Sequence, residues 1–147
     1  MQRNAFRLER VLNFRREAEK LRKLELAAAR REYELAEDRL RREEEAMEKL
    51  NLEFMERQIE GICALELQLY SEFFRKKKQE ITLRREQVNE LDRAVLEKRE
   101  NLMEASTDKK IMEELKKKKV REQEKLMAEK ERNFLDELAL RPRRQEL

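Results

Sequence analysis

The chain lacks histidine and tryptophan, and its 147 residues include only one glycine, one proline and one cysteine. Sheets and α/β folds need many turns, which glycine and proline supply, so one of each excludes those fold classes. The absence of histidine excludes enzymes built on histidine chemistry and metal sites that use histidine ligands. We therefore expect no cofactor and no metal.

Long apolar runs are absent as well. No stretch free of charged residues exceeds five residues, whereas a membrane-spanning helix needs about 20 apolar residues. The first residues carry arginines with no apolar core behind them, which is not the pattern of a secretory signal. The lone Cys63 cannot form an intramolecular disulfide, which fits a reducing cytoplasm. We expect no direct insertion into a membrane.

Charge dominates what is present. The chain has 37 Lys or Arg and 34 Asp or Glu, for a net charge of +3. Together with its Ala and Leu content, this composition is typical of a long helix or a coiled coil. General acid–base catalysis needs a carboxylate in a buried cleft, and a thin coil leaves its carboxylates in water. We expect no enzymatic activity.

Two long segments carry apolar residues at the spacing of a coiled coil. In residues 11–54, thirteen positions spaced by three and four hold eleven apolar residues, and the exceptions are Glu25 and Glu43. Three steps of four between Leu21 and Tyr33 predict a stutter, which would locally unwind a left-handed supercoil. The pattern predicts one long helical seam. Its apolar members are Val11, Phe14, Ala18, Leu21, Ala29, Tyr33, Ala36, Leu40, Met47, Leu50 and Phe54.

The second seam follows the only glycine. Twelve positions of residues 67–105 alternate by three and four without a slip, and nine of them are apolar. Residues 106–108 are polar, but three polar residues rarely stop so long a helix. The helix should end at Arg141-Pro142, because proline lacks the amide donor and disfavours helix in the preceding residue. After residue 108 the apolar seam is expected to return at Met112, Val120, Met127, Phe134 and Leu138.

Gly61 is the best place for the chain to reverse, because glycine accepts the left-handed conformation that closes a helix. We predict an all-α fold, a long antiparallel two-helix coiled-coil hairpin with unequal arms and a longer C-terminal helix. Residue i would then face roughly residue 123 − i, and about 20 C-terminal residues would extend past the N-terminus. The expected organisation is a single domain over residues 1–147, with helix 1 over about 4–58, a turn over about 59–64, helix 2 over about 65–140 and a tail over 141–147.

Charge is distributed unevenly along this hairpin. Residues 32–60 carry eleven acids and five bases, and opposite charges across a coiled coil select its pairing. Residues 1–16 have a net charge of +4 and residues 109–121 a net charge of +5. These basic stretches would face each other at the open end, where like charges weaken the hairpin. Near the turn we expect Glu43, Glu44, Glu45 and Glu48 to face Arg75, Lys76, Lys77 and Lys78.

The basic open end has three interpretations. It can be a solvated face, a surface for an acidic protein, or a surface for nucleic acid or an anionic membrane. Counterion release would favour nucleic acid, but no aromatic residue interleaves with Lys116–Lys119 to stack bases. Among possible partners we therefore expect a protein and no nucleic acid.

Aromatic residues gather near the turn. Phe54, Tyr70 and Phe74 lie on the seams and should pin the hairpin. Phe73 and Leu69 lie off the seam and are better placed for an exposed docking face. Further apolar residues off the seam should stay partly exposed, among them Leu8, Leu24, Leu26, Leu52 and Leu83.

Several short patterns occur together with the mid-chain glycine. They are Phe6-x-Leu8-x-x-Val11-Leu12-x-x-Arg15, Leu24-Glu25-Leu26-Ala27-Ala28-Ala29 and Glu131-x-x-x-Leu135-Asp136-Glu137-Leu138-Ala139. With the length and the helical composition, their conjunction resembles the FliJ family of flagellar type III export proteins over essentially the whole chain. The resemblance implies a non-enzymatic, cytoplasmic component of the export apparatus, peripheral to the inner membrane at the flagellar base.

The same resemblance implies the partners and the residues that contact them. The partners would be the flagellar export ATPase hexamer, the cytoplasmic domain of the export-gate membrane protein, and substrate chaperones. Gate binding would use Leu50 and Phe73, although Glu43 and Lys77 are charged where family members place gate contacts. Binding to the ATPase ring would use Arg3, Arg7, Arg10, Arg132, Phe134 and Leu138.

The expected mechanism is mechanical. A coil inserted in a ring can couple the ATP-driven states of the ring to a distant gate, and a basic end would be steered into an acidic pore. Three alternatives remain open from the residues alone. They are a parallel homodimeric rod that ignores Gly61, a nucleic-acid-binding coil, and the stalk of an injectisome, which shares this architecture.

Overall fold

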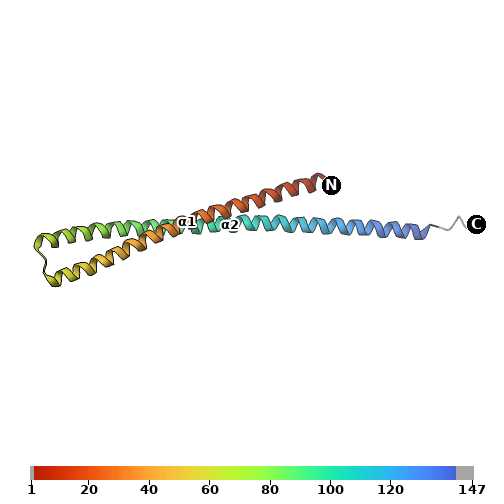
Figure 1. Ribbon diagram of the computed structural model, residues 1–147. Coiled ribbons are helices and arrows are strands. Elements are labelled where there is room, and N and C mark those ends of the chain that lie inside the picture. Colours follow the sequence, from red (N-terminus) through yellow and green to blue (C-terminus); the bar gives the residue numbers. More distant parts are fainter. Residues whose placement is uncertain (1, 142–147) are drawn as a thin grey trace, which may run out of the picture. The chain divides into compact units, whose positions relative to one another are not determined.

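The structure is a computed structural model that describes residues 2–141, with the side chains of residue 5 and residues 7–141. Over that range it consists of two helices, α1 (Gln2–Glu60) and α2 (Ala64–Leu140), and it contains no strand. The helices pack as a hairpin, and α2 is the longer at 77 residues against 59 (Figure 1). This is the all-α hairpin that the two apolar seams predict. The predicted tail beyond residue 141 lies outside the described residues.

The chain reverses at Gly61, as predicted. Its φ of +103° lies in the region that favours glycine, because a Cβ there would strain the backbone. The Gly61 amide donates to the Arg57 carbonyl at 3.0 Å and closes α1, and the Leu67 amide donates to the Cys63 carbonyl at 3.1 Å in the first turn of α2. A straight rod that ignores Gly61 is therefore wrong for this chain.

Contacts divide the chain into two compact units. Unit 1 consists of Met1–Glu19 and Glu104–Leu147, and unit 2 is Lys20–Met103. Each unit contains part of α1 and an antiparallel part of α2. The polar residues 106–108 do not interrupt α2.

The α2 seam of unit 2 follows the prediction closely. Every predicted position from residue 70 to residue 102 is buried or half-buried, whereas Leu67 at the start is 45% exposed. Ile81 and Val95 are the most buried residues of this row, each 7% exposed. On α1 they are matched by Leu26 and Ala36, at 6% and 7%. Leu26 was expected off the seam, and that expectation was wrong. It was also wrong for Leu8 of unit 1, which is half-buried at a seam position.

Three rings fill the seam next to the turn. The Phe54 ring centroid lies 5.1 Å from that of Tyr70 and 5.4 Å from that of Phe74, and the last two are 6.3 Å apart. Tilted and edge-on contacts at these separations stabilise a core beyond their buried area. The prediction that these aromatic residues pin the hairpin is confirmed.

The predicted pairing of the acids near the turn was displaced along α2. Glu43 and Glu44 pair with Arg84 and Arg85, at 3.5 and 3.1 Å, instead of with residues 75–78. Glu43 and Arg84 both occupy seam positions of their helices, so the register of the seam brings them together. Lys77 reaches Glu80 of its own helix at 3.4 Å. The register of the seam therefore determines which acids and bases pair. Matching blocks of opposite charge along the sequence did not predict these partners.

The start of the predicted α1 seam was also wrong. Val11 and Phe14 in unit 1 are 41% and 67% exposed, and Leu21 in unit 2 is 56% exposed. One row of buried or half-buried positions at the start of α1 consists of residues 8, 12, 15 and 19 in unit 1, and residues 22, 26, 29 and 33 in unit 2. The predicted seam residues Ala18 and Glu25 are also half-buried, next to this row. Counted along the sequence, the positions of this row alternate by four and three, so no stutter is needed. Polar residues hold seam positions that the apolar pattern had assigned to their neighbours.

Candidate interaction surfaces

The seam of unit 1 is largely ionic around one apolar layer. Leu12 is completely buried, and the half-buried Met112 lies on the facing row. Glu19 is only 5% exposed, and the Lys109 ammonium lies 3.1 and 3.0 Å from its two carboxylate oxygens. A carboxylate so deeply buried needs a charged partner. Lys109 meets that need from the opposite helix.

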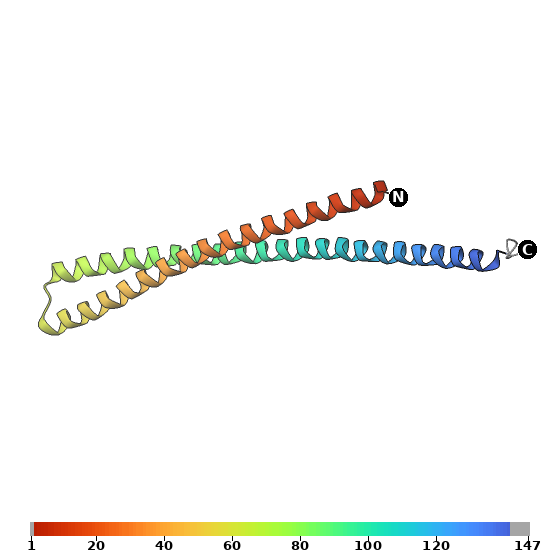
Figure 2. The ribbon, with the colours of Figure 1, turned by 45° about the vertical axis from the view of Figure 1, so that its right-hand side comes forward.

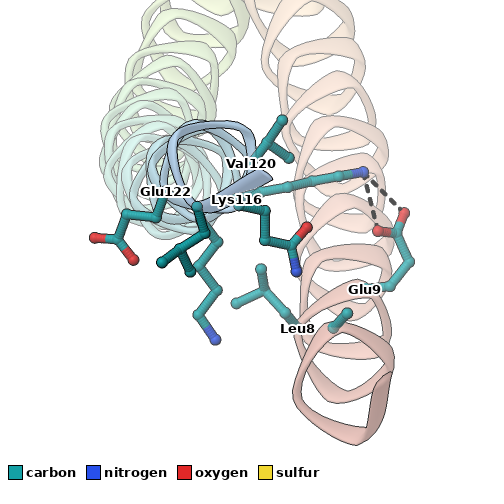
Figure 3. A pocket seen from close by; sticks show the side chains of 9 residues that line it. Leu8, Glu9, Lys116, Val120 and Glu122 are labelled. Carbon is teal, nitrogen blue, oxygen red and sulfur yellow. Dashed lines mark hydrogen bonds and ion pairs between the residues drawn. The ribbon is translucent and has the colours of Figure 1, made fainter. Parts of the chain in front are cut away.

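Two more ion pairs join the helices of unit 1. The Arg15 guanidinium lies 3.2 Å from the Asp108 carboxylate. Lys116 extends across the unit, and its ammonium lies 3.1 and 2.9 Å from the two oxygens of Glu9 (Figure 3). The like charges were expected to weaken the hairpin here. Acids next to and within the basic stretches form ion pairs between the two helices, and the expected weakening stays a prediction.

A groove opens beside the Lys116–Glu9 pair. Its volume is about 240 Å³. In Figure 3 the side chain of Leu8 lies between the two helices, while the carboxylate of Glu122 points away from α1. The lining is apolar at its centre and charged at its edge, and it consists of Ala5, Leu8, Glu9, Lys116, Lys119, Val120, Glu122, Gln123 and Leu126.

Beyond this groove α2 has no neighbour within the described chain. Every described residue after Lys119 is exposed, and in both views the blue end of α2 extends past the N-terminal end of α1 (Figures 1 and 2). The predicted return of the seam here was wrong apart from Met112. The other four predicted seam residues are 44–70% exposed, and they are Val120, Met127, Phe134 and Leu138.

Five of the six residues predicted to bind a ring are therefore exposed in unit 1. Arg7 and Arg10 lie on the surface of α1, and Arg132 lies on the unpaired part of α2. Phe134 and Leu138 are 61% and 44% exposed. The side chain of the sixth, Arg3, lies outside the described residues. We call the five exposed residues the terminal surface.

The two residues predicted to bind a gate line one groove of unit 2. Leu50 comes from α1 and is half-buried, while Phe73 comes from α2 and is 48% exposed. The groove has a volume of about 350 Å³ and is also lined by Arg57, Glu66, Leu69 and Tyr70. The Lys77 ammonium lies 5.9 Å from the centre of the Phe73 ring, within the range of a cation–π contact. We call this surface the tip groove.

Two titratable groups of unit 2, Glu25 and Tyr33, have a shifted pKa. The hydrogen bond from Arg22 lowers the pKa of Glu25, and Lys98 adds to the effect. The negative charge of Glu37 raises the pKa of Tyr33. No cluster of candidate metal ligands occurs among the described residues. No helix in the described part of the chain has an apolar stretch sufficient to span a membrane.

The ionic layers of unit 1 were missed from the sequence. The apolar residues Val11 and Phe14 led to a predicted seam on a side of α1 that does not face α2. Continuing the three–four spacing backwards from Ala29 reaches Leu26, Arg22, Glu19 and Arg15, so the signal was available in the spacing. It was hidden because these seam positions carry charge.

Comparison with known proteins extends over nearly the whole chain. The family model described as "FliJ: Flagellar FliJ protein" matches residues 4–146. Searches of curated proteins and of solved structures found no match. The family match covers both helices and the turn between them. The chain therefore belongs to the FliJ family, which makes it a component of flagellar type III protein export.

Proposed function

We propose that this chain is a non-enzymatic stalk of the export apparatus that binds the hexameric export ATPase and couples it to the export gate. In this proposal the terminal surface binds the ATPase ring, and the tip groove binds the cytoplasmic domain of the gate protein. The chain also escorts substrate chaperones. It works in the cytoplasm at the inner membrane, beneath the flagellar base.

The observation that carries ring binding is the unpaired end of α2. A helix that exposes large apolar side chains is stabilised by burying them against another surface. Phe134 and Leu138 are not buried against any surface of the described chain, so we expect a partner protein to supply that surface. Arg7 and Arg10 add positive charge, which would speed association with an acidic pore.

The tip groove supports gate binding by its composition. Phe73 presents about half of its surface next to an apolar floor formed by Leu50 and Tyr70. Aromatic anchors in apolar grooves supply much of the binding free energy at protein interfaces. The ion pair between Arg57 and Glu66, 3.7 Å apart, would form a polar rim.

Charge reversal tests ring binding. Arg3→Glu, Arg7→Glu and Arg10→Glu together should weaken binding to the ATPase ring by about tenfold or more at low salt, and less at high salt, because the attraction is screened. The matched control reverses three exposed arginines of unit 2, Arg30, Arg31 and Arg42, with the same change of charge. A quantitative pull-down in which both triple variants bind like the parent would contradict the proposal.

Removing the aromatic side chain of Phe73 distinguishes the tip groove from the terminal surface. Phe73→Ala should reduce binding to the isolated cytoplasmic domain of the gate protein by about tenfold, the usual loss when an aromatic anchor is removed, and leave ring binding unchanged. Leu83→Ala is the control, since Leu83 is 64% exposed and lies outside the tip groove. Equal losses in the two variants would show that the tip groove is not the gate-binding surface.

A further inference from the structure

Unit 1 carries an exposed apolar patch that neither the seam nor the proposed function uses. Val11 and Phe14 on α1 are 41% and 67% exposed, and Ile111 and Leu115 on α2 are 60% and 39% exposed. Phe14 is the most exposed phenylalanine among the described side chains. We call these four residues the side patch.

Helix geometry places the four residues on one face. Each directly precedes a seam residue, so on each helix they share the same flank of the seam. Two antiparallel helices are related by an approximate two-fold axis perpendicular to both helix axes. Residues that directly precede seam residues therefore lie on the same side of the helix pair in both helices. The Glu9–Lys116 ion pair sets the register, which puts Val11 opposite Leu115 and Phe14 opposite Ile111.

Charges of opposite sign bound the side patch at its two ends. Toward the chain termini the bases Arg7 and Lys118 lie on the same flank, with Arg10 and Arg121 beside them, and the acids there are Glu114 and Glu122, so the net charge is positive. The other end has acids, and they are Glu17, Glu104 and the Asp108 that pairs with Arg15. The face is therefore apolar in the middle, basic at one end and acidic at the other.

We propose that a second copy of this chain covers the side patch. A two-fold axis across the patch lays α1 on the α1 of the second copy in the opposite direction, so that Phe14 packs on Val11 and the basic end of each copy faces the acidic end of the other. Such a surface is self-complementary, which a two-fold dimer requires. Laying the copies in the same direction would put bases on bases and acids on acids.

The dimer should be weak. Four apolar side chains are a small core compared with the roughly 1,200 Å² or more that stable interfaces bury. We expect a dissociation constant on the order of 10–300 μM. The dimer would cover Arg7, so it would compete with the ATPase ring; this consequence rests on the proposed function, whereas dimerisation itself does not.

Sedimentation equilibrium of the full chain, from about 5 μM to 1 mM, tests the proposal. The parent should show a monomer–dimer equilibrium, and Phe14→Gln with Ile111→Gln should raise the dissociation constant about tenfold or more. Leu24→Gln with Leu83→Gln is the matched control, since these leucines are 70% and 64% exposed in unit 2, and it should associate like the parent. A monomeric parent at 1 mM, or equal association of all three proteins with unchanged helicity, would overturn the proposal.

Charge reversal tests the orientation. Arg7→Glu with Lys118→Glu makes both ends of the face acidic, so the opposed arrangement predicts a dissociation constant raised about tenfold at low salt. Arg30→Glu with Arg31→Glu, which changes the net charge equally within unit 2, should have much less effect. An unchanged constant in the first variant would refute the opposed arrangement, because copies laid in the same direction meet like charges both before and after the reversal.

Discussion

Unit 1 and unit 2 use the same spacing but fill it with different residues. In unit 2, five of the twenty buried or half-buried seam positions carry charge, and they are Arg22, Glu43, Lys77, Arg84 and Lys98. In unit 1, five of nine do, and they are Arg15, Glu19, Lys109, Lys116 and Lys119. Spacing alone thus sets which side of each helix faces its neighbour, while residue type sets how strongly the two helices hold together.

The difference has an energetic consequence. Burying an apolar side chain contributes roughly 1.5–3 kcal/mol, whereas a buried ion pair is close to neutral compared with an apolar pair of similar size. Removing one partner of an ion pair is costly, however, because a buried charge remains. The association of the two helices should therefore be more stable in unit 2 than in unit 1. In unit 1 the ion pairs should specify which residues meet while adding less stability. An adaptable unit 1 would suit the proposed binding to a partner.

The largest effect is expected from the apolar core of unit 2. Ile81→Ala should lower the free energy of unfolding by about 2–4 kcal/mol, because it removes buried methyl groups and leaves a cavity. Leu83→Ala, two residues away and 64% exposed, should change it by less than about 0.5 kcal/mol. Urea unfolding followed by circular dichroism measures both. Similar losses in the two variants would show that unit 2 lacks the firm seam described here.

The ionic seam of unit 1 should respond next. Glu19→Ala should cost about 1–3 kcal/mol locally, less than a fully buried pair because the Lys109 side chain is 23% exposed. Glu19→Leu with Lys109→Leu should restore or exceed the stability of the parent, since the layer becomes apolar. Hydrogen exchange of the amides in residues 8–19 reports the change. If the double variant exchanged as fast as Glu19→Ala, the pair would have a role beyond compensating buried charge.

The turn of unit 2 should be sensitive to its backbone. Gly61→Ala should cost about 1–2 kcal/mol because a residue with a Cβ is strained at positive φ. The space around Gly61 is open, so the cost is conformational and not steric. Thermal unfolding should show the loss, and hydrogen exchange should confine it to unit 2. A variant as stable as the parent would mean that the turn adopts another conformation.

The smallest effect concerns acid pH. The Arg22 guanidinium, 3.0 Å from Glu25, lowers the pKa of Glu25, and the Lys98 ammonium adds to this effect. A lowered folded-state pKa gives stability that is present above the unfolded pKa and is lost as the pH falls through the folded pKa. Glu25→Gln should therefore make the decline of the urea midpoint below about pH 5 slightly shallower. A steeper decline in the variant would contradict this sign.

Sequence spacing predicted most of the fold. It identified the turn at Gly61, the length difference between the helices and the α2 seam from Tyr70 to Leu102. It failed where charged residues occupy the seam. There, a search for apolar residues selects residues on the neighbouring flank of the helix, such as Phe14, in place of the seam residues. A buried carboxylate such as Glu19 is favourable only with its partner in place, and that partner lies on the other helix. Pairing information of this kind is not local.

The terminal surface and the tip groove differ in how much of each could be predicted from the sequence. Phe134 and Leu138 lie at exposed positions of unit 1 that follow from the unequal helix lengths, and Arg7 is exposed because it lies off the seam of α1. The tip groove needs the pairing of both helices, because Leu50 and Phe73 come from α1 and α2.

Hydrogen exchange of the intact chain at low and high salt tests the contrast between the units most directly. Salt weakens ion pairs and leaves apolar burial intact or strengthens it. We predict that residues 8–19 and 105–119 exchange several-fold faster at about 1 M salt than at about 0.05 M, while residues 26–54 and 70–102 exchange at the same rate or more slowly. Equal responses of unit 1 and unit 2 would contradict the account of an ionic seam in one and an apolar seam in the other.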